Sequence, residues 1–285
     1  MMKSSVTFTL KCLGLCLLAN ALLAPGAVAA SPALYSISSG QFDQVVRDFS
    51  ADSAYTSVSP ASSLGSIFGF ELGLIAGVSN SPNLNSIAQQ ANSGASASLL
   101  PNAALFGALT IPFGLTLEAL YFPAVSISGV TYQQLGGAVK WTFTDGIVVL
   151  PFSMAVRGFF TTTETSFSQT VSNSFTAGLP VTTSVDLTDA LYGLQLLASK
   201  DLLFAEPYVG IGYMRANATA TTSGGNPLAP VFSPAFTTAS SATSTLASSE
   251  FLLGLNFKLA LVRLGAEYAR LYDTDRYSLK LSLAF

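Results

Sequence analysis

The chain has 285 residues, of which 50% are hydrophobic and only 9% are charged, and its formal net charge at pH 7 is -3. Soluble domains usually carry about 25% charged residues, so this composition argues against an ordinary soluble secreted domain. The acidic balance also argues against nucleic acid as a partner, because nucleic-acid binding requires a basic face.

Residues 1–30 have the pattern of a secretory signal peptide. Lys3 precedes a mostly apolar run, and a group of small residues ends at Ala30. This order of charge, apolar run and small residues predicts export and cleavage near Ala30. Both cysteines, Cys12 and Cys16, lie within the segment. The exported chain is therefore expected to contain no thiol and no disulfide.

Residues 31–63 are expected to form a separate N-terminal segment that contains a short amphipathic helix. Four apolar residues recur at the i, i+3, i+4 and i+7 spacing of a helix face: Phe42, Val45, Val46 and Phe49. Ser38 and Gln41 are placed for a capping box at its start. The helix could be a plug in the mouth of a barrel or a periplasmic tether against its rim, because the spacing defines a face and not its partner.

Residues 64–285 alternate apolar residues with polar or small ones in about ten segments. The segments are 68–74, 105–111, 115–121, 134–143, 152–160, 192–196, 209–213, 251–259, 264–269 and 276–285. Alternation with period two predicts strands with one apolar face. A membrane-spanning helix is a poorer interpretation, since the longest apolar stretch is broken by Pro112, Gly114 and Glu118. The pattern predicts an all-β, antiparallel, up-and-down transmembrane β-barrel of about ten strands, with eight to twelve as the range.

The connections between these segments alternate in length. Tight turns are expected at 112–114, 145–146, 200–201 and around Leu261. Longer connections are expected at 80–101, 124–130, 161–188, 220–248 and 273–275, most of them as solvated loops rich in Ser, Thr, Ala and Asn. Within the connection 161–188, the segments 167–175 and 181–187 could extend the strands or add a hairpin. An even strand number places both termini at the short-turn end, which is periplasmic in bacterial barrels.

The last strand has apolar residues at every second position: Tyr277, Leu279, Leu281, Leu283 and Phe285. This pattern resembles the C-terminal signature of bacterial outer-membrane β-barrel proteins. The resemblance covers about ten residues, and it implies an outer-membrane location and recognition of this strand by the barrel assembly machinery. The last strand of a soluble β-sandwich would also alternate, but it would not require such an apolar composition.

Charged residues gather on the face of the strands opposite the apolar one: Glu71, Glu118, Lys140, Arg157, Lys258, Glu267 and Lys280. Because basic residues facing lipid would be costly, we expect these side chains in the barrel lumen. They could pair and fill the lumen, or line a narrow polar path. Glycines on the same face, such as Gly254 and Gly265, leave room for long side chains, the N-terminal helix or a hydrophobic ligand.

The chain contains no histidine, and its two cysteines lie in the predicted signal peptide. A Ser-His or Cys-His nucleophile and an ordinary zinc site therefore cannot be assembled. We expect no catalytic residues, no metal site and no cofactor.

These observations favour a non-enzymatic outer-membrane barrel, structural or surface-exposed, with a largely filled lumen and external loops as its interaction surface. The alternative is a narrow channel or transporter for small or hydrophobic solutes, with the N-terminal helix as its plug. The expected partners are outer-membrane lipid, the barrel assembly machinery during biogenesis and, for the alternative, a small or hydrophobic ligand.

Overall fold

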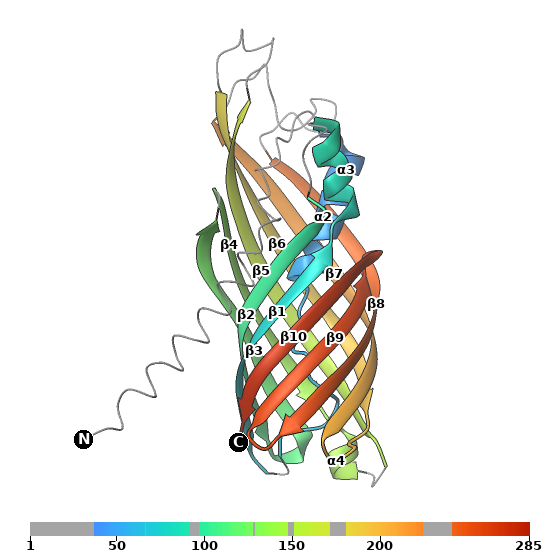
Figure 1. The fold of residues 1–285 in the computed structure, drawn as a ribbon. Helices are drawn as coiled ribbons and strands as arrows, with labels where there is room; N and C mark the ends of the chain where they lie inside the picture. The colour runs from blue at the N-terminus through green and yellow to red at the C-terminus, as the bar shows by residue number, and fades with distance from the viewer. Residues whose placement is uncertain are drawn as a thin grey trace, which may run out of the picture.

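The computed structural model describes residues 37–65, 67–91, 97–127, 129–147, 151–171, 181–224 and 241–285. The predicted signal peptide, residues 1–30, lies outside the described residues. Ten strands form a closed antiparallel barrel (Figure 1). Each strand pairs with its neighbours in sequence, and β1 closes the barrel on β10, with Leu74 opposite Leu281 and Val78 opposite Tyr277. The predicted up-and-down barrel of about ten strands is confirmed.

The strands differ in length around the barrel. They are β1 (Gly69–Asn80), β2 (Leu99–Ile111), β3 (Leu115–Ile127), β4 (Val130–Trp141), β5 (Ser153–Val171), β6 (Val181–Ser199), β7 (Ala205–Gly224), β8 (Ser241–Leu259), β9 (Val262–Leu271) and β10 (Thr274–Ala284). Strands β5 to β8 are the longest, and they rise above the others at the end opposite the C-terminus (Figure 1). One wall of the barrel is therefore taller than the other.

The alternating residues separate into two faces, as the sequence predicts. Leu72, Leu194 and Leu279 point outward and are 53%, 63% and 64% exposed. Their sequence neighbours point into the barrel and are buried, as with Glu71 and Lys280. An apolar exterior around a polar interior is the arrangement of a barrel in a membrane, so the prediction of an outer-membrane β-barrel fold is confirmed.

The four connections that the sequence predicts to be tight lie at one end of the barrel, and all but the one around 145–146 are short. The first contains a 3₁₀ turn, η1 (Pro112–Gly114), in which Phe113 and Gly114 both have φ of 71°. The second, residues 142–152, is longer and contains the single helical turn α4 (Thr144–Ile147), at the same end of the barrel as the C-terminus (Figure 1). The connection at 273–275, expected to be one of the longer ones, is instead a tight turn. Tyr272 and Asp273 have φ of 51° and 61°, as the central residues of a type I′ hairpin do.

Several segments expected to be solvated loops are strands or helix. Strands β5 and β6 pair without interruption up to Val171 and Val181, and β7 and β8 pair up to Thr221 and Ser241. For 167–171 and 181–187 this is the strand extension that the sequence leaves open. Elsewhere the expectation of loops was wrong, because the apolar alternation stops where the outer face becomes polar, while Thr and Ser continue the strand. The connection after β1 contains a helix, α3 (Pro82–Ala91).

The predicted amphipathic helix is confirmed as α2 (Ser39–Ser53). Its capping box has the expected form, with the Ser38 side chain accepting from the Gln41 amide and the Gln41 side chain accepting from the Ser38 amide. Its apolar residues Phe42, Val45 and Val46 are buried in one hydrophobic cluster with Leu84 of α3. Phe49 is half-buried against the same cluster.

None of the helices among the described residues is long and apolar enough to cross a membrane.

Candidate functional site: a lumen filled by the N-terminal segment

The described part of the N-terminal segment, from residue 37 onward, lies inside the barrel. Helix α2 occupies the half opposite the C-terminus, and the chain after it runs through the lumen toward the tight turns (Figure 1). All residues from Ser50 to Ala61 are buried. We call α2 together with Ala54–Leu64 the plug. Of the two interpretations that the sequence leaves open, plug or tether against the rim, this position inside the barrel favours the plug.

Glu118 of β3 is the centre of the first charged cluster. Its carboxylate lies 3.1 Å from Arg157 Nε of β5 and 3.8 Å from Lys140 Nζ of β4. It also accepts a 2.8 Å hydrogen bond from the hydroxyl of Tyr55 in the plug. All four side chains are buried. Burial and the neighbouring Glu118 carboxylate raise the pKa of Tyr55, so this hydroxyl stays protonated and remains a donor.

The basic side chains of the wall also bind the main chain of the plug. Lys140 Nζ donates to the carbonyl oxygens of Pro60 and Ser62, each at 2.9 Å. Arg157 donates to the carbonyl of Ser59 at 3.3 Å. These residues therefore satisfy plug carbonyls that water would otherwise have to satisfy, which is a requirement for burying irregular chain.

A second cluster surrounds Arg276 of β10. Its guanidinium donates to the carbonyls of Ala54 at 2.7 Å and Ala51 at 3.3 Å, at the end of α2. It also lies 3.6 Å from the Glu250 carboxylate, which accepts a hydrogen bond from Gln195. A basic group at a helix C-terminus also interacts favourably with the helix dipole.

Glu71 and Lys280 form the third pair, 2.8 Å apart on the adjacent strands β1 and β10. Lys280 Nζ donates to the hydroxyl of Ser59 in the plug at 2.6 Å and lies 4.8 Å above the Phe106 ring. Its ammonium group is thus held by a carboxylate, a hydroxyl and an aromatic face.

Two of the predicted charged residues are arranged differently. Glu267 forms no ion pair among the described residues and accepts hydrogen bonds from Thr56 at 2.6 Å and Tyr208 at 2.9 Å. Lys258 does not join the central clusters; it pairs near the tight-turn end with Asp201 at 2.6 Å and Glu206 at 2.8 Å. The charges thus pair along the wall, on adjacent or next-nearest strands, because the plug occupies the centre of the lumen.

Sequence reasoning missed Arg276, Glu250 and Tyr208. Each continues an alternation that the sequence already shows, since Arg276 shares the parity of Lys280, and Glu250 that of Lys258. Arg276 lies within the predicted segment 276–285, and extending the segments 209–213 and 251–259 by one residue would have found Tyr208 and Glu250. Their partners on the plug carry no comparable signal, because the contacts are to main-chain carbonyls.

Small residues make the space that the plug and the wall side chains fill. A Cβ atom on Gly254 would lie 2.1 Å from the Tyr208 ring, and one on Gly265 would lie 2.8 Å from Val58 of the plug. Of the occupants that the sequence allows for this room, the structure shows long side chains and the N-terminal segment.

The polar face of α2 carries two buried carboxylates. Asp52 accepts hydrogen bonds from Ser79 at 2.7 Å and Asn102 at 2.8 Å, and Asp48 accepts from the Leu84 amide at 2.7 Å. Burial raises the pKa of Asp52 from 3.8 to about 6, and it raises that of Asp48 as well.

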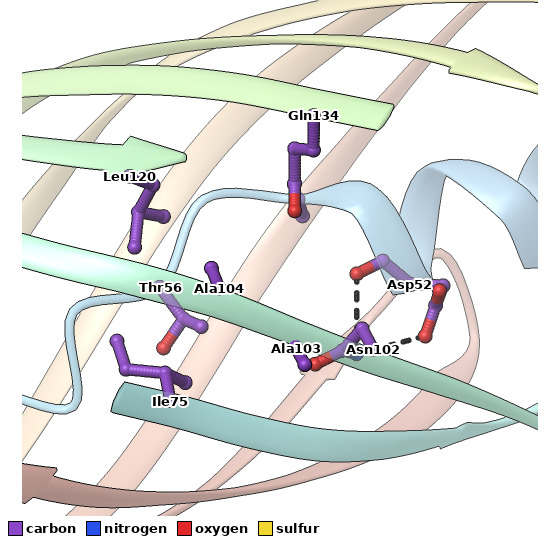
Figure 2. Close-up of a pocket in the computed structure, with 9 residues that line it drawn as sticks. Asp52, Thr56, Ile75, Asn102, Ala103, Ala104, Leu120 and Gln134 are labelled. Atoms are coloured by element: carbon purple, nitrogen blue, oxygen red, sulfur yellow. Dashed lines mark hydrogen bonds between the residues drawn. The ribbon is translucent and has the colours of Figure 1, made fainter. Parts of the chain in front are cut away.

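A small cavity of about 10 Å³ lies beside Asp52, between the plug and the wall (Figure 2). This is about the space of one water molecule. The lining comes from the plug and from strands β1 to β4: Asp52, Ala54, Thr56, Ile75, Asn102, Ala103, Ala104, Leu120 and Gln134. Asn102 lies beside Asp52, and the side chain of Thr56 lies beside Ile75 and Ala104 (Figure 2).

The described residues contain no group of three or more His, Cys, Asp or Glu placed to hold a metal ion. The buried carboxylates of Glu71, Glu118 and Glu250 are each engaged by a basic side chain or by hydrogen bonds. Through these hydrogen bonds and ion pairs, the wall of the barrel holds the polar plug segment in the lumen.

Solved structures similar to this chain are outer-membrane barrels. The attachment invasion locus protein Ail of Yersinia pestis is 11% identical, with a TM-score of 0.33 over 76% of this chain and 97% of Ail. The outer-membrane protease OmpT of Escherichia coli is 9% identical, with a TM-score of 0.43 over 82% of this chain and 100% of OmpT. Neisserial surface protein A is 10% identical, with a TM-score of 0.28 over 76% of this chain and 95% of that protein. Similarity at this level carries no function over to this chain.

No curated protein matches the sequence. A family model described as a family of unknown function, DUF6588, matches residues 27–285. The match covers the plug and the whole barrel, and the chain belongs to this family.

Proposed function

We propose that this protein is a non-enzymatic outer-membrane barrel whose lumen is closed by its own N-terminal segment, and that it acts through its external surface. The observation that supports the proposal is that Arg276, Lys140 and Arg157 donate hydrogen bonds to main-chain carbonyls of the plug. Side chains of the wall that bind main-chain carbonyls recognise a polypeptide segment and not a particular small solute. The lumen is therefore built to hold this segment.

A plug-gated passage for a small or hydrophobic solute is the second candidate. It is favoured by the polar character of the surface between plug and wall, where Ser50 bonds to Asp189, Thr56 to Glu267 and Ser59 to Lys280. Polar groups of this kind can exchange their partners for water when a segment leaves. No cysteine follows Cys16, so no disulfide fixes the plug to the wall.

The location and partners follow from the outer face. The apolar belt supports outer-membrane lipid as the surrounding phase, and the exposed side of β10 supports the barrel assembly machinery as a partner during biogenesis. That side is formed by Tyr277, Leu279, Leu281, Leu283 and Phe285, which are 47% to 65% exposed. We place the start of β1, the C-terminus and the tight turns in the periplasm, and the taller β5–β8 wall with the external loops outside the cell.

Single-channel conductance of the refolded protein in a planar bilayer tests the proposal. A closed barrel predicts no current from the full-length chain, and discrete steps from a chain that lacks residues 31–63. Arg276→Ala, which removes the donor to Ala51 and Ala54, should give intermittent openings, whereas the control Lys258→Ala, near the tight-turn end, should stay silent. Steady current from the full-length protein would overturn the closed lumen, and solute-dependent openings would favour the second candidate.

A further inference from the structure

The wall of the barrel is not continuously hydrogen-bonded. Strands β2 and β3 pair only from Leu105 opposite Tyr121 to Ile111 opposite Leu115. Beyond that point Leu99–Ala104 pairs with β1 alone, and Phe122–Ile127 pairs with β4 alone. We call these two facing segments the β2–β3 seam. Among the described strands, it is the neighbouring pair that shares the shortest ladder.

The local sequence explains why the ladder stops. Pro123 has no amide hydrogen, and the register of β3 against β4 shifts between Phe122 and Val125. A bulge at this place bends β3 and changes its twist. Pro101 removes another donor from β2. Proline is confined to edges and bulges of sheets, so both strands behave as edges here.

The seam begins at the upper limit of the apolar belt. Tyr121, at its start, points outward and is 51% exposed, and Leu105 opposite it is 50% exposed. Aromatic residues mark the boundary between hydrocarbon and headgroups in barrels. Above Tyr121 water and headgroups can satisfy the free backbone groups, which hydrocarbon could not do. The exposed Leu99, 51% accessible, continues the apolar surface along the edge of β2.

The cavity beside Asp52 lies directly behind the seam (Figure 2). The cavity is lined from the β2 edge by Asn102, Ala103 and Ala104. From β3 it is lined by Leu120, which lies near the end of the part of β3 that pairs with β2. The lining also includes the polar side chains of Asp52 and Gln134. The space behind the seam therefore combines small apolar residues with hydrogen-bonding groups, one of which, Asn102, stands on the β2 edge itself.

We propose that the β2–β3 seam is a lateral binding site that admits a single-chain neutral amphiphile, such as a monoacylglycerol, from the outer leaflet toward the lumen. The acyl chain would lie between Ala103, Ala104 and Leu120, and the hydroxylated head would reach Asn102 and Gln134. The carboxyl group of Asp52 disfavours an anionic head. Widening the cavity to receive the chain breaks no β2–β3 ladder hydrogen bond, because the seam has none. The head would replace plug atoms as hydrogen-bond partners, since Asn102 donates to Asp52 and Gln134 donates to the Ser53 carbonyl.

Photolabelling of the full-length protein in lipid vesicles tests this site. The probe is a monoacylglycerol that carries a diazirine on its acyl chain, and its adducts are mapped by mass spectrometry. The site predicts adducts on the inward residues Ala104 and Leu120 and on Thr56 of the plug, in addition to those on the lipid-facing belt. Adducts confined to belt residues would overturn the proposal without any variant.

Two matched variants sharpen the test. Ala104→Leu fills the cavity behind the seam, and Ala138→Leu adds the same volume at an inward position of β4, where pairing on both sides is complete. Overpacking should lower inward adducts about tenfold in the first variant only. Equal loss in both variants, or equal labelling by a photoreactive fatty acid with its anionic head, would contradict the site or its preference for a neutral head. These results do not depend on conductance, so a failure of the closed lumen would be seen separately.

Discussion

Individual side chains in the lumen each serve two partners, one on the wall and one on the plug. Arg276 contacts Glu250 and the end of α2, and Lys140 contacts Glu118 and two plug carbonyls. Such doubly engaged charges are costly to bury but even costlier to leave with one partner missing. The stability of the closed state therefore depends on few residues.

Arg276→Ala should lower the free energy of unfolding by about 3 to 5 kcal/mol, because Glu250 is left as an unpaired buried charge. The control is Arg270→Ala, whose pair with Asp275 is exposed and should contribute no more than about 1 kcal/mol. Urea unfolding in detergent micelles measures both. Equal effects of the two variants would show that the Arg276 cluster does not stabilise the fold.

Asp52 should make stability depend on pH. Its pKa is about 6 in the folded protein and 3.8 ordinarily, so the folded state binds more protons between these values, and stability falls as pH rises from about 4 to about 6. The difference corresponds to roughly 3 kcal/mol at 1.36 kcal/mol per pH unit. In Asp52→Asn this contribution to the fall should disappear, while the contributions of the other buried carboxyl groups, such as Asp48, remain. An unchanged pH profile of urea unfolding would contradict this assignment.

At the scale of elements, strand and helix formation follow local rules, but pairing between elements does not. Helix α2 begins where its capping box predicts, and each tight turn forms where the apolar pattern pauses. The β2–β3 seam, in contrast, arises from one bulge in β3 at Pro123. A proline and a bulge in one strand thus end the β2–β3 hydrogen-bond ladder, while β2 continues to pair with β1 and β3 with β4.

The seam predicts uneven protection of amides along β2. Amides of Leu99–Ala104 that face β3 have no ladder partner, whereas those of Leu105–Ile111 do. Hydrogen exchange of the protein in micelles should therefore be faster for the first group than for the second, on the same strand and at the same side. Equal protection would show that the two edges pair in solution, and it would also weaken the proposed lateral site.

At the scale of the whole molecule, the outer face divides into an apolar belt and a polar upper wall. On β6 and β7 the outward residues change from Leu194 and Ile211 to Thr188 and Thr219, with Tyr192 and Tyr213 near the change. A barrel that spans a membrane with its tall wall in water needs this division.

Arginine placed in each region tests the position of the membrane. Leu194→Arg should destabilise the barrel in vesicles by about 2 to 4 kcal/mol if the site is near the bilayer midplane. Thr219→Arg, on the outward face of the tall wall, should change stability little, because its side chain stays in water. Reversible denaturant unfolding in vesicles gives both values, and a large cost at Thr219 would place the membrane higher than proposed.

The sequence by itself determined the barrel class, the outward apolar residues and the start of α2. These features depend on period-two alternation, turn residues and a capping box, all of which are local. It also indicated the inward position of Glu118, Lys140 and Arg157, because parity along a strand fixes the face.

The tertiary structure alone decided what fills the lumen and where the wall is unpaired. Lys140, Arg157 and Arg276 bind main-chain carbonyls of the plug, and a carbonyl is present at every residue, so no sequence pattern marks it as a partner. The lengths of β5 to β8 also depended on pairing, since Thr-rich segments suit loops and strands alike until a neighbouring strand supplies the hydrogen bonds.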